Sequence, residues 1–205
     1  MSSRSQTCGV FAIVSVLAIS IAVSMSQAAK PSRETQAAGL AAWEKVYSVL
    51  ISPRCINCHT ATDYPQQGDD RHRHFANVVR GPGGAGVPGL HCQSCHQELN
   101  ADSTGVPGGP SWHLAPLSMQ WQDLNDRPFS SAAVCSSVVD RSRNENMSGP
   151  DLLRHHERAD LVLWAWNPGR RPDGSLRSTP PISHQEFVAA TRTWVEAGTP
   201  CPKGR

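Results

Sequence analysis

Two short stretches of the chain share one pattern: Cys55-Ile56-Asn57-Cys58-His59 and Cys92-Gln93-Ser94-Cys95-His96. In each, two cysteines are separated by two residues and a histidine follows the second cysteine directly. This is the attachment motif of c-type haem, in which two thiols add to the porphyrin vinyl groups and the next imidazole binds the iron. The two motifs predict two covalently held haem c groups, with His59 and His96 as the proximal iron ligands.

A structural zinc site is the alternative interpretation, because two Cys-x-x-Cys pairs can supply four thiolates at tetrahedral geometry. A zinc ribbon does not require a histidine after each pair. Its pairs are usually about 15 to 20 residues apart, which is less than the segment 59–91 that separates these two. The pattern therefore favours haem.

The start of the chain predicts export. Arg4 precedes an apolar run from Val10 to Val23, and Ser26-Gln27-Ala28 has the small-x-small form of a cleavage site. A retained membrane anchor is the alternative, but the run is shorter than the roughly 20 apolar residues that span a bilayer. We expect residues 1–28 to be a cleavable signal peptide. The mature protein is then periplasmic, which agrees with haem attachment outside the cytoplasm.

The remaining residues predict one loop-rich domain. The chain has 205 residues, with 16 glycines and 16 prolines. We expect a flexible lead at residues 29–36 and a single dihaem domain at 37–205. Such a chain buries little apolar surface by itself, whereas two porphyrins supply a large apolar filling. The haem-free form is therefore expected to fold poorly.

The charge of the mature chain is close to balanced. Without Arg4, the chain has 18 Lys and Arg and 17 Asp and Glu, and haem propionates would add negative charge, so we expect no nucleic-acid partner.

The remaining cysteines predict a disulfide. Cys8 leaves with the signal peptide and four cysteines bind haem, which leaves Cys135 and Cys201. In an oxidising compartment these two are expected to form a disulfide, free thiols being the alternative.

Three segments have helical periodicity, and we expect a mainly α domain with about three or four main helices. In 37–50, apolar residues recur every three or four positions, and Pro53 follows shortly after. Segment 149–166 has a second apolar face. Ser183-His184-Gln185-Glu186 reads as a capping box that opens a third helix, which Gly198 ends.

Four residues are candidate distal ligands of the two irons. His74 has apolar neighbours, whereas His72 lies among charged residues and His91 adjoins its own attachment motif. After the second motif, Met119 and His113 compete within an apolar, tryptophan-containing segment. His156 lies on the apolar face of the 149–166 helix, whereas His155 points about 100° away and is expected to be exposed. The candidates are thus His74, Met119, His156 and His113.

The two motifs make the chain resemble dihaem c-type cytochromes, and a helix ahead of the first motif is similar to their N-terminal helix. A small dihaem family labelled as isoquinoline 1-oxidoreductase-associated is similar in further segments. These are Gly105-Val106-Pro107-Gly108, Trp112-His113-Leu114-Ala115-Pro116, Trp164-Ala165-Trp166 and Cys201-Pro202. That resemblance implies electron transfer for an exported molybdenum hydroxylase. A distal histidine upstream of the second motif also resembles the small dihaem subunit of periplasmic nitrate reductase.

The favoured function is therefore an electron carrier with no small-molecule substrate. It would pass single electrons between a periplasmic or membrane dehydrogenase and a respiratory acceptor. One alternative is a dihaem peroxidase-like enzyme, in which one haem has an open distal side and His113 acts as acid or base. Another is a haem-binding sensor or a structural subunit of a membrane complex.

Overall fold

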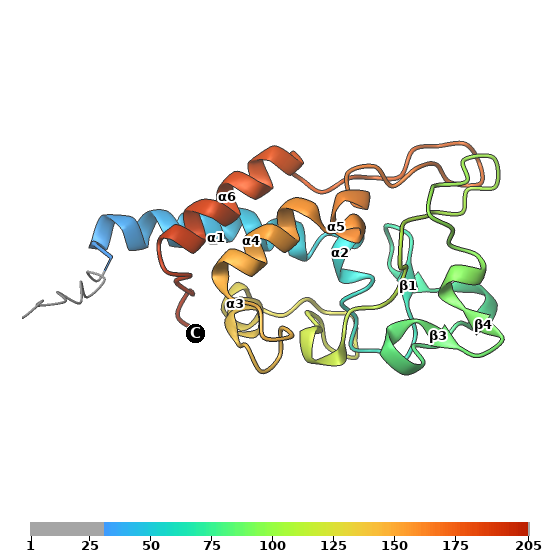
Figure 1. Cartoon of the computed structure of the whole chain (residues 1–205), viewed down its shortest axis with the longest axis horizontal. Coiled ribbons are helices and arrows are strands. Elements are labelled where there is room, and N and C mark those ends of the chain that lie inside the picture. The colour runs from blue at the N-terminus through green and yellow to red at the C-terminus, as the bar shows by residue number, and fades with distance from the viewer. Residues whose placement is uncertain (1–30, 205) are drawn as a thin grey trace, which may run out of the picture. The chain divides into compact units, whose positions relative to one another are not determined.

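A computed structural model describes residues 31–204. The expected signal peptide, residues 1–28, lies outside the described residues. Within 31–204, no helix combines the length and the apolar content needed to cross a membrane. The α-helices are α1 (Arg33–Leu50), α2 (Pro53–Ile56), α3 (Ser131–Val139), α4 (Gly149–Arg158), α5 (Asp160–Trp164) and α6 (His184–Glu196) (Figure 1).

The remaining regular structure is short. The strands are β1 (Gln66–Gln67), β2 (His72–Arg73), β3 (Gly86–Val87) and β4 (Leu90–His91). β1 pairs antiparallel with β2, and β3 pairs antiparallel with β4. Single 3₁₀ turns occur at Phe75–Asn77, Pro82–Gly84, Cys92–Ser94 and Leu117–Met119. The expectation of a mainly α, loop-rich chain is confirmed.

α1 begins earlier than the sequence predicts. The Ser32 hydroxyl accepts a hydrogen bond from the backbone N–H of Thr35 at 3.1 Å, which caps the helix and starts it at Arg33. Residues 33–36 therefore belong to the helix, and the expectation of a flexible lead there is wrong. The helix ends at Leu50, and Pro53 opens the short α2 that carries the chain into the first Cys-x-x-Cys-His motif.

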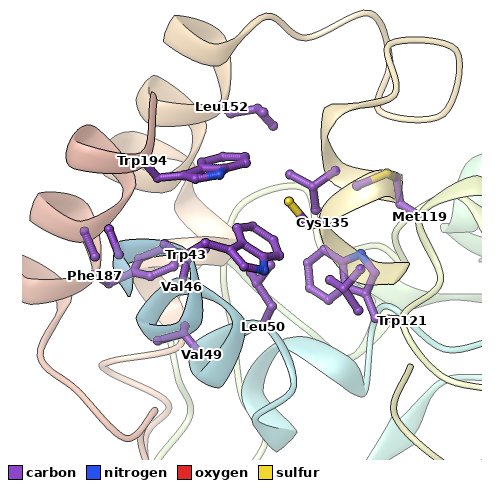
Figure 2. Packing of buried hydrophobic residues seen from close by; sticks show 14 of the residues in the cluster. Trp43, Val46, Val49, Leu50, Met119, Trp121, Cys135, Leu152, Phe187 and Trp194 are labelled. Atoms are coloured by element: carbon purple, nitrogen blue, oxygen red, sulfur yellow. The ribbon is translucent and has the colours of Figure 1, made fainter. Parts of the chain in front are cut away.

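The hydrophobic core lies where α1 and α6 pack together (Figure 2). Trp43 of α1 and Trp194 of α6 are fully buried, and their ring centroids lie 4.9 Å apart. Each indole N–H has a partner, because Trp43 donates to the Ser131 hydroxyl at 2.9 Å and Trp194 donates to the Pro200 carbonyl at 3.0 Å. These pairings satisfy the polar ends of two large buried side chains.

α3 was not expected, although it completes the core. The Ser130 hydroxyl caps it by accepting from the Ala133 N–H at 3.3 Å. Its Cys135 is fully buried and forms a disulfide with Cys201, with a Cα–Cα distance of 5.6 Å. The predicted disulfide is thus confirmed, and it fastens the C-terminal segment to α3.

The segment predicted as one helix over 149–166 is two helices. α4 begins with a capping box between Ser148 and Asp151 and ends at Arg158. Ala159 is extended, with ψ of 130°, and α5 starts directly after it. Residues 156–160 contain neither glycine nor proline, so nothing local in the sequence marks this break. The third expected helix is confirmed as α6, with its capping box between Ser183 and Glu186.

The segment around the second motif contrasts with this core. Every side chain of 57–113 is described, and none of them belongs to the buried hydrophobic set. Its buried side chains are polar and include Thr60, Thr62, Gln66 and Arg80. Arg80 joins the loops by donating to the carbonyls of Thr60, at 3.0 Å, and Ala115. Hydrogen bonds rather than apolar packing hold this part of the chain together.

Candidate haem sites

The histidine of the first motif is held in one orientation. His59 Nδ1 donates to the Met119 carbonyl oxygen at 2.7 Å, and its ring stacks on Trp121 with centroids 3.4 Å apart and planes 4° apart. Trp121 in turn donates its backbone N–H to the His59 carbonyl at 2.9 Å. A bond at Nδ1 fixes the tautomer and leaves Nε2 as the nitrogen available to a metal. Burial lowers the pKa of His59 to about 3, which keeps the ring neutral, as a metal ligand must be.

The second motif repeats this arrangement with different residues. His96 Nδ1 donates to the Pro107 carbonyl at 2.7 Å, and the ring stacks on Trp112 with centroids 4.4 Å apart and planes 2° apart. Burial also lowers the pKa of His96. Both motifs therefore present a neutral imidazole with a free Nε2, supported on one side by an indole.

The thiols of the two motifs lie close to each other. Cys55 and Cys58 are half-buried by area, yet desolvation raises their pKa values to about 12 and about 11. A thiol that is desolvated and yet partly accessible lies at the wall of a cavity. Cys92 is close enough to Cys58 to contribute to that rise, and both line the same cavity. The two haem attachment sites are therefore adjacent.

The four thiols do not gather into a zinc-like site. Among residues 31–204, no group of three or more His, Cys, Asp or Glu side chains converges on a point where it could hold a metal ion. Each Cys-x-x-Cys pair instead lies beside the histidine of its own motif.

A cavity of about 700 Å³ opens beside the second motif. Its walls include Cys92, Cys95 and His96, together with Trp112 and Trp164. Apolar surface predominates in the lining. Two of the lining residues, Arg54 and His72, each have one buried polar atom, Nε and Nε2, with no hydrogen-bond partner among the described residues. A large apolar ring with a metal centre and carboxylate arms matches this combination, so the residues present fit haem.

His74 lies near His96, and both line this cavity. The two ring centroids are 5.9 Å apart with planes at 68°. His74 Nδ1 donates to the Phe75 carbonyl at 2.5 Å, so Nε2 is again the free nitrogen. Metal–imidazole bonds are about 2 Å long, and a centroid separation of this size accommodates one metal ion between two imidazoles. The geometry supports the sequence-based preference for His74.

His72, which the sequence suggested to be solvated, lines the same cavity. Its Nδ1 bonds to the Asp70 carboxylate at 2.7 Å, while its Nε2 is buried and unpartnered. His72 therefore belongs to the environment of the second motif, and it is the natural comparison for His74. His91 is exposed at the end of β4.

Two further histidines lie near enough to His59 to affect its titration. His155 and His113 both contribute to lowering the pKa of His59, and the contribution of His155 is the larger. Desolvation lowers the pKa of His155 itself, and its side chain lines a cavity beside α4. The sequence analysis had not selected His155. His113 has its Nδ1 bonded to the Ser111 carbonyl and also lines the second cavity.

The other two candidate ligands lie in packed positions. Met119 is buried in the core, where its sulfur contacts the Ser137 hydroxyl at 4.0 Å. Its backbone carbonyl accepts the hydrogen bond from His59 Nδ1. His156 is buried between α4 and α6, with Nδ1 bonded to the Thr191 hydroxyl at 3.0 Å. Both positions favour structural roles over iron ligation.

The chain was compared with protein-family models, with curated proteins and with solved structures, and no match was found in any of the three.

Proposed function

We propose that this protein is an exported dihaem c-type cytochrome that carries single electrons. The observation that carries the proposal is the repeated arrangement at the two motifs. In each, the motif histidine donates Nδ1–H to a backbone carbonyl 2.7 Å away and stacks on an indole. Independent segments of the chain supply these supports, so the arrangement is not a consequence of the short motif alone.

The chain would hold its two groups through residues already described. Cys55 and Cys58 would form the thioethers at the first site, and His59 would be the proximal ligand. Cys92 and Cys95 would do so at the second site, with His96 proximal and His74 distal. Haem c supplies one-electron chemistry at iron, at a potential set by the axial ligands and their surroundings.

The protein's own groups favour electron transfer over substrate chemistry. At the second site, His74, whose ring centroid lies 5.9 Å from that of His96, would hold the haem together with His96 and would leave no open position for a peroxide. The shared cavity wall at Cys58 and Cys92 supports electron exchange within one chain. The peroxidase-like alternative requires an open distal side, which this arrangement does not favour.

The partners follow from the resemblance to dihaem cytochromes. We propose that the protein works in the periplasm, between a dehydrogenase and a respiratory acceptor. An exported molybdenum hydroxylase is the particular donor that the isoquinoline 1-oxidoreductase-associated family suggests.

The test is spectroscopy of the purified, exported protein. A pyridine haemochrome assay should give two haems per chain, and EPR of the oxidised protein should show two low-spin centres. Absence of the 695 nm band of Met ligation is expected, because Met119 is packed in the core. A high-spin signal that shifts on adding peroxide would favour the enzyme, and protein exported without haem would overturn the proposal.

A further inference from the structure

Three arginine side chains line the cavity beside the second motif: Arg54, Arg171 and Arg177. Arg54 is the most buried of them, with a side chain only 4% exposed. Its Nε is buried and has no hydrogen-bond partner among the described residues. The Arg54 guanidinium therefore has hydrogen-bonding capacity that the described residues leave unused, on a residue that forms part of the cavity wall.

The arginines are incompletely paired with carboxylates. Asp69 pairs with Arg54 at 2.5 Å, and the same carboxylate also pairs with Arg171. Arg177 donates to backbone carbonyls, including that of Gly105 at 2.5 Å. No carboxylate of the described residues forms an ion pair with Arg177, although Asp102 and Asp69 are near enough to raise its pKa. One more carboxylate, Asp70, lines the cavity, but it is bonded to His72.

The pKa values of Arg54 and Arg177 reflect the proximity of these charges. Desolvation lowers the pKa of Arg54, the charge of Asp69 opposes this shift, and the positive charge of Arg171 adds to it. The pKa of Arg177 is also lowered, first by desolvation and then by Arg54 and Arg171, against opposing contributions from Asp102 and Asp69. Three guanidinium groups in a desolvated space repel one another. The Asp69 carboxylate offsets part of this repulsion, and a further anion would offset more.

We infer that Arg54, together with Arg171 and Arg177, forms a carboxylate-binding cradle that receives the propionates of the haem attached at Cys92 and Cys95. This inference rests on the proposed function. Guanidinium groups bind carboxylates through paired, charge-assisted hydrogen bonds, and the three arginines bring such donors to the wall of one cavity. Arg54 directly precedes Cys55, so the first motif would position the group carried by the second.

Arg54 is a positioning residue in this scheme, and its positive charge should also raise the reduction potential of the second haem. Reduction adds an electron, and a nearby cation stabilises the added negative charge. Replacing Arg54 by glutamine should therefore lower the midpoint potential of that haem while the first haem changes less.

The experiment uses the exported holoprotein and the Arg54→Gln variant. Arg192→Gln is the matched control, since Arg192 is a half-exposed arginine on α6 whose carboxylate partner is Glu157, at 3.5 Å. Redox titration followed by EPR separates the two midpoints, and resonance Raman reports hydrogen bonding to the propionates. We expect Arg54→Gln to lower the second midpoint and shift the propionate bending modes, with Arg192→Gln unchanged. Arg54→Lys should restore part of the potential but not the Raman signature.

Unchanged midpoints and unchanged propionate modes in an Arg54→Gln protein that holds two haems would overturn the inference and leave the proposed function intact. Wild-type protein without haem would instead overturn the proposed function. If Arg54→Gln does not accumulate, Arg171→Gln, at a more exposed position, serves as the second variant. The holoprotein is also titrated with succinate. A spectral response that Arg54→Gln abolishes would assign the cradle to free carboxylates instead.

Discussion

The imidazole rings of His74 and His96 lie with their centroids 5.9 Å apart, although 21 intervening residues separate them along the chain. Each ring has its Nδ1 bonded to a backbone carbonyl, of Phe75 and Pro107 respectively. The hairpin of β1 and β2 brings His74 to this position. Two imidazoles with matching tautomers on opposite sides of one space form a pair suited to a single metal.

His74→Ala is therefore expected to convert the second haem from low spin to high spin, while the first haem keeps its low-spin signal. EPR and the visible spectrum of the oxidised protein are the measurements. His72→Ala is the matched control, because His72 lines the same cavity and its Nε2 is also unpartnered. A high-spin centre in His72→Ala, with His74→Ala unchanged, would reverse the assignment.

At the first site we propose His155 as the distal ligand, because it lines a cavity beside α4 and lies near enough to His59 to contribute to lowering its pKa. His155→Met should replace a bis-His spectrum with one that shows Met ligation near 695 nm. The same substitution at His113 should leave the first haem unchanged. The 695 nm band in His113→Met alone would transfer the role to His113.

The disulfide should contribute strongly to stability. It closes a loop between residues 66 positions apart, and the chain-entropy model gives about 4 kcal/mol for a loop of that size. Urea unfolding of the Cys135→Ser/Cys201→Ser holoprotein should show a loss of about this size, and reducing the wild-type disulfide should reproduce it. The haem spectra should not change, because neither cysteine belongs to a haem motif. Equal midpoints in urea for the variant and the wild type would contradict this.

The capping box of α6 gives a prediction about pH. Hydrogen bonds from the Ser183 side chain and backbone lower the pKa of Glu186. A carboxylate whose pKa is lower in the folded state stabilises the fold above its unfolded pKa, and this stability is lost as the pH falls through the folded pKa. Thermal unfolding should show Glu186→Gln less stable than wild type at pH 7. The difference should shrink below about pH 4.

Ser183→Ala removes the cap itself and should cost about 1 kcal/mol across the same pH range. A Glu186→Gln deficit that does not depend on pH would show that lost packing, rather than lost charge, is responsible.

Loss of the second haem should unfold one region selectively. Residues 57–113 contribute no buried hydrophobic side chain, whereas Trp43 and Trp194 are fully buried in the α1–α6 core. In the Cys92→Ser/Cys95→Ser variant, hydrogen exchange should become fast in 60–113 and stay slow in α1 and α6. The corresponding double substitution at Cys55 and Cys58 should instead expose α2 and the core beside it. Retained protection of 60–113 in the first variant would refute the dependence on haem.

Local sequence signals were sufficient for several elements. The periodicity of 37–50 and the Ser183–Glu186 capping box act within one helix, and both appear in α1 and α6. The disulfide followed from elimination among the cysteines. The start of α1 at Arg33 was missed because the Ser32 cap precedes the apolar pattern. α3 was missed because its apolar run is short and lies between polar loops.

The surroundings of the two motifs could not be read from the sequence in the same way. The roles of His155 and His156 depend on which side of α4 faces α6, and the bond from His156 to Thr191 of α6 shows that His156 lies on that side. The placement of Arg54 beside the second motif depends on contacts between segments far apart along the chain, such as its pair with Asp69 and its position 5.8 Å from the Trp164 ring. Such relations arise only when loops without periodicity fold together.

The burial of the first pair of thiols has a consequence for the biogenesis of the protein. Thiolates are the reactive form of cysteine, and pKa values of about 12 and 11 leave Cys55 and Cys58 almost entirely protonated in the folded chain. Thiols in this state react slowly, so we expect covalent attachment at this motif to come before the chain closes around it. The Cys135–Cys201 bond joins segments that both follow the motifs in sequence. Oxidation of that pair therefore leaves the four motif thiols free for attachment to haem.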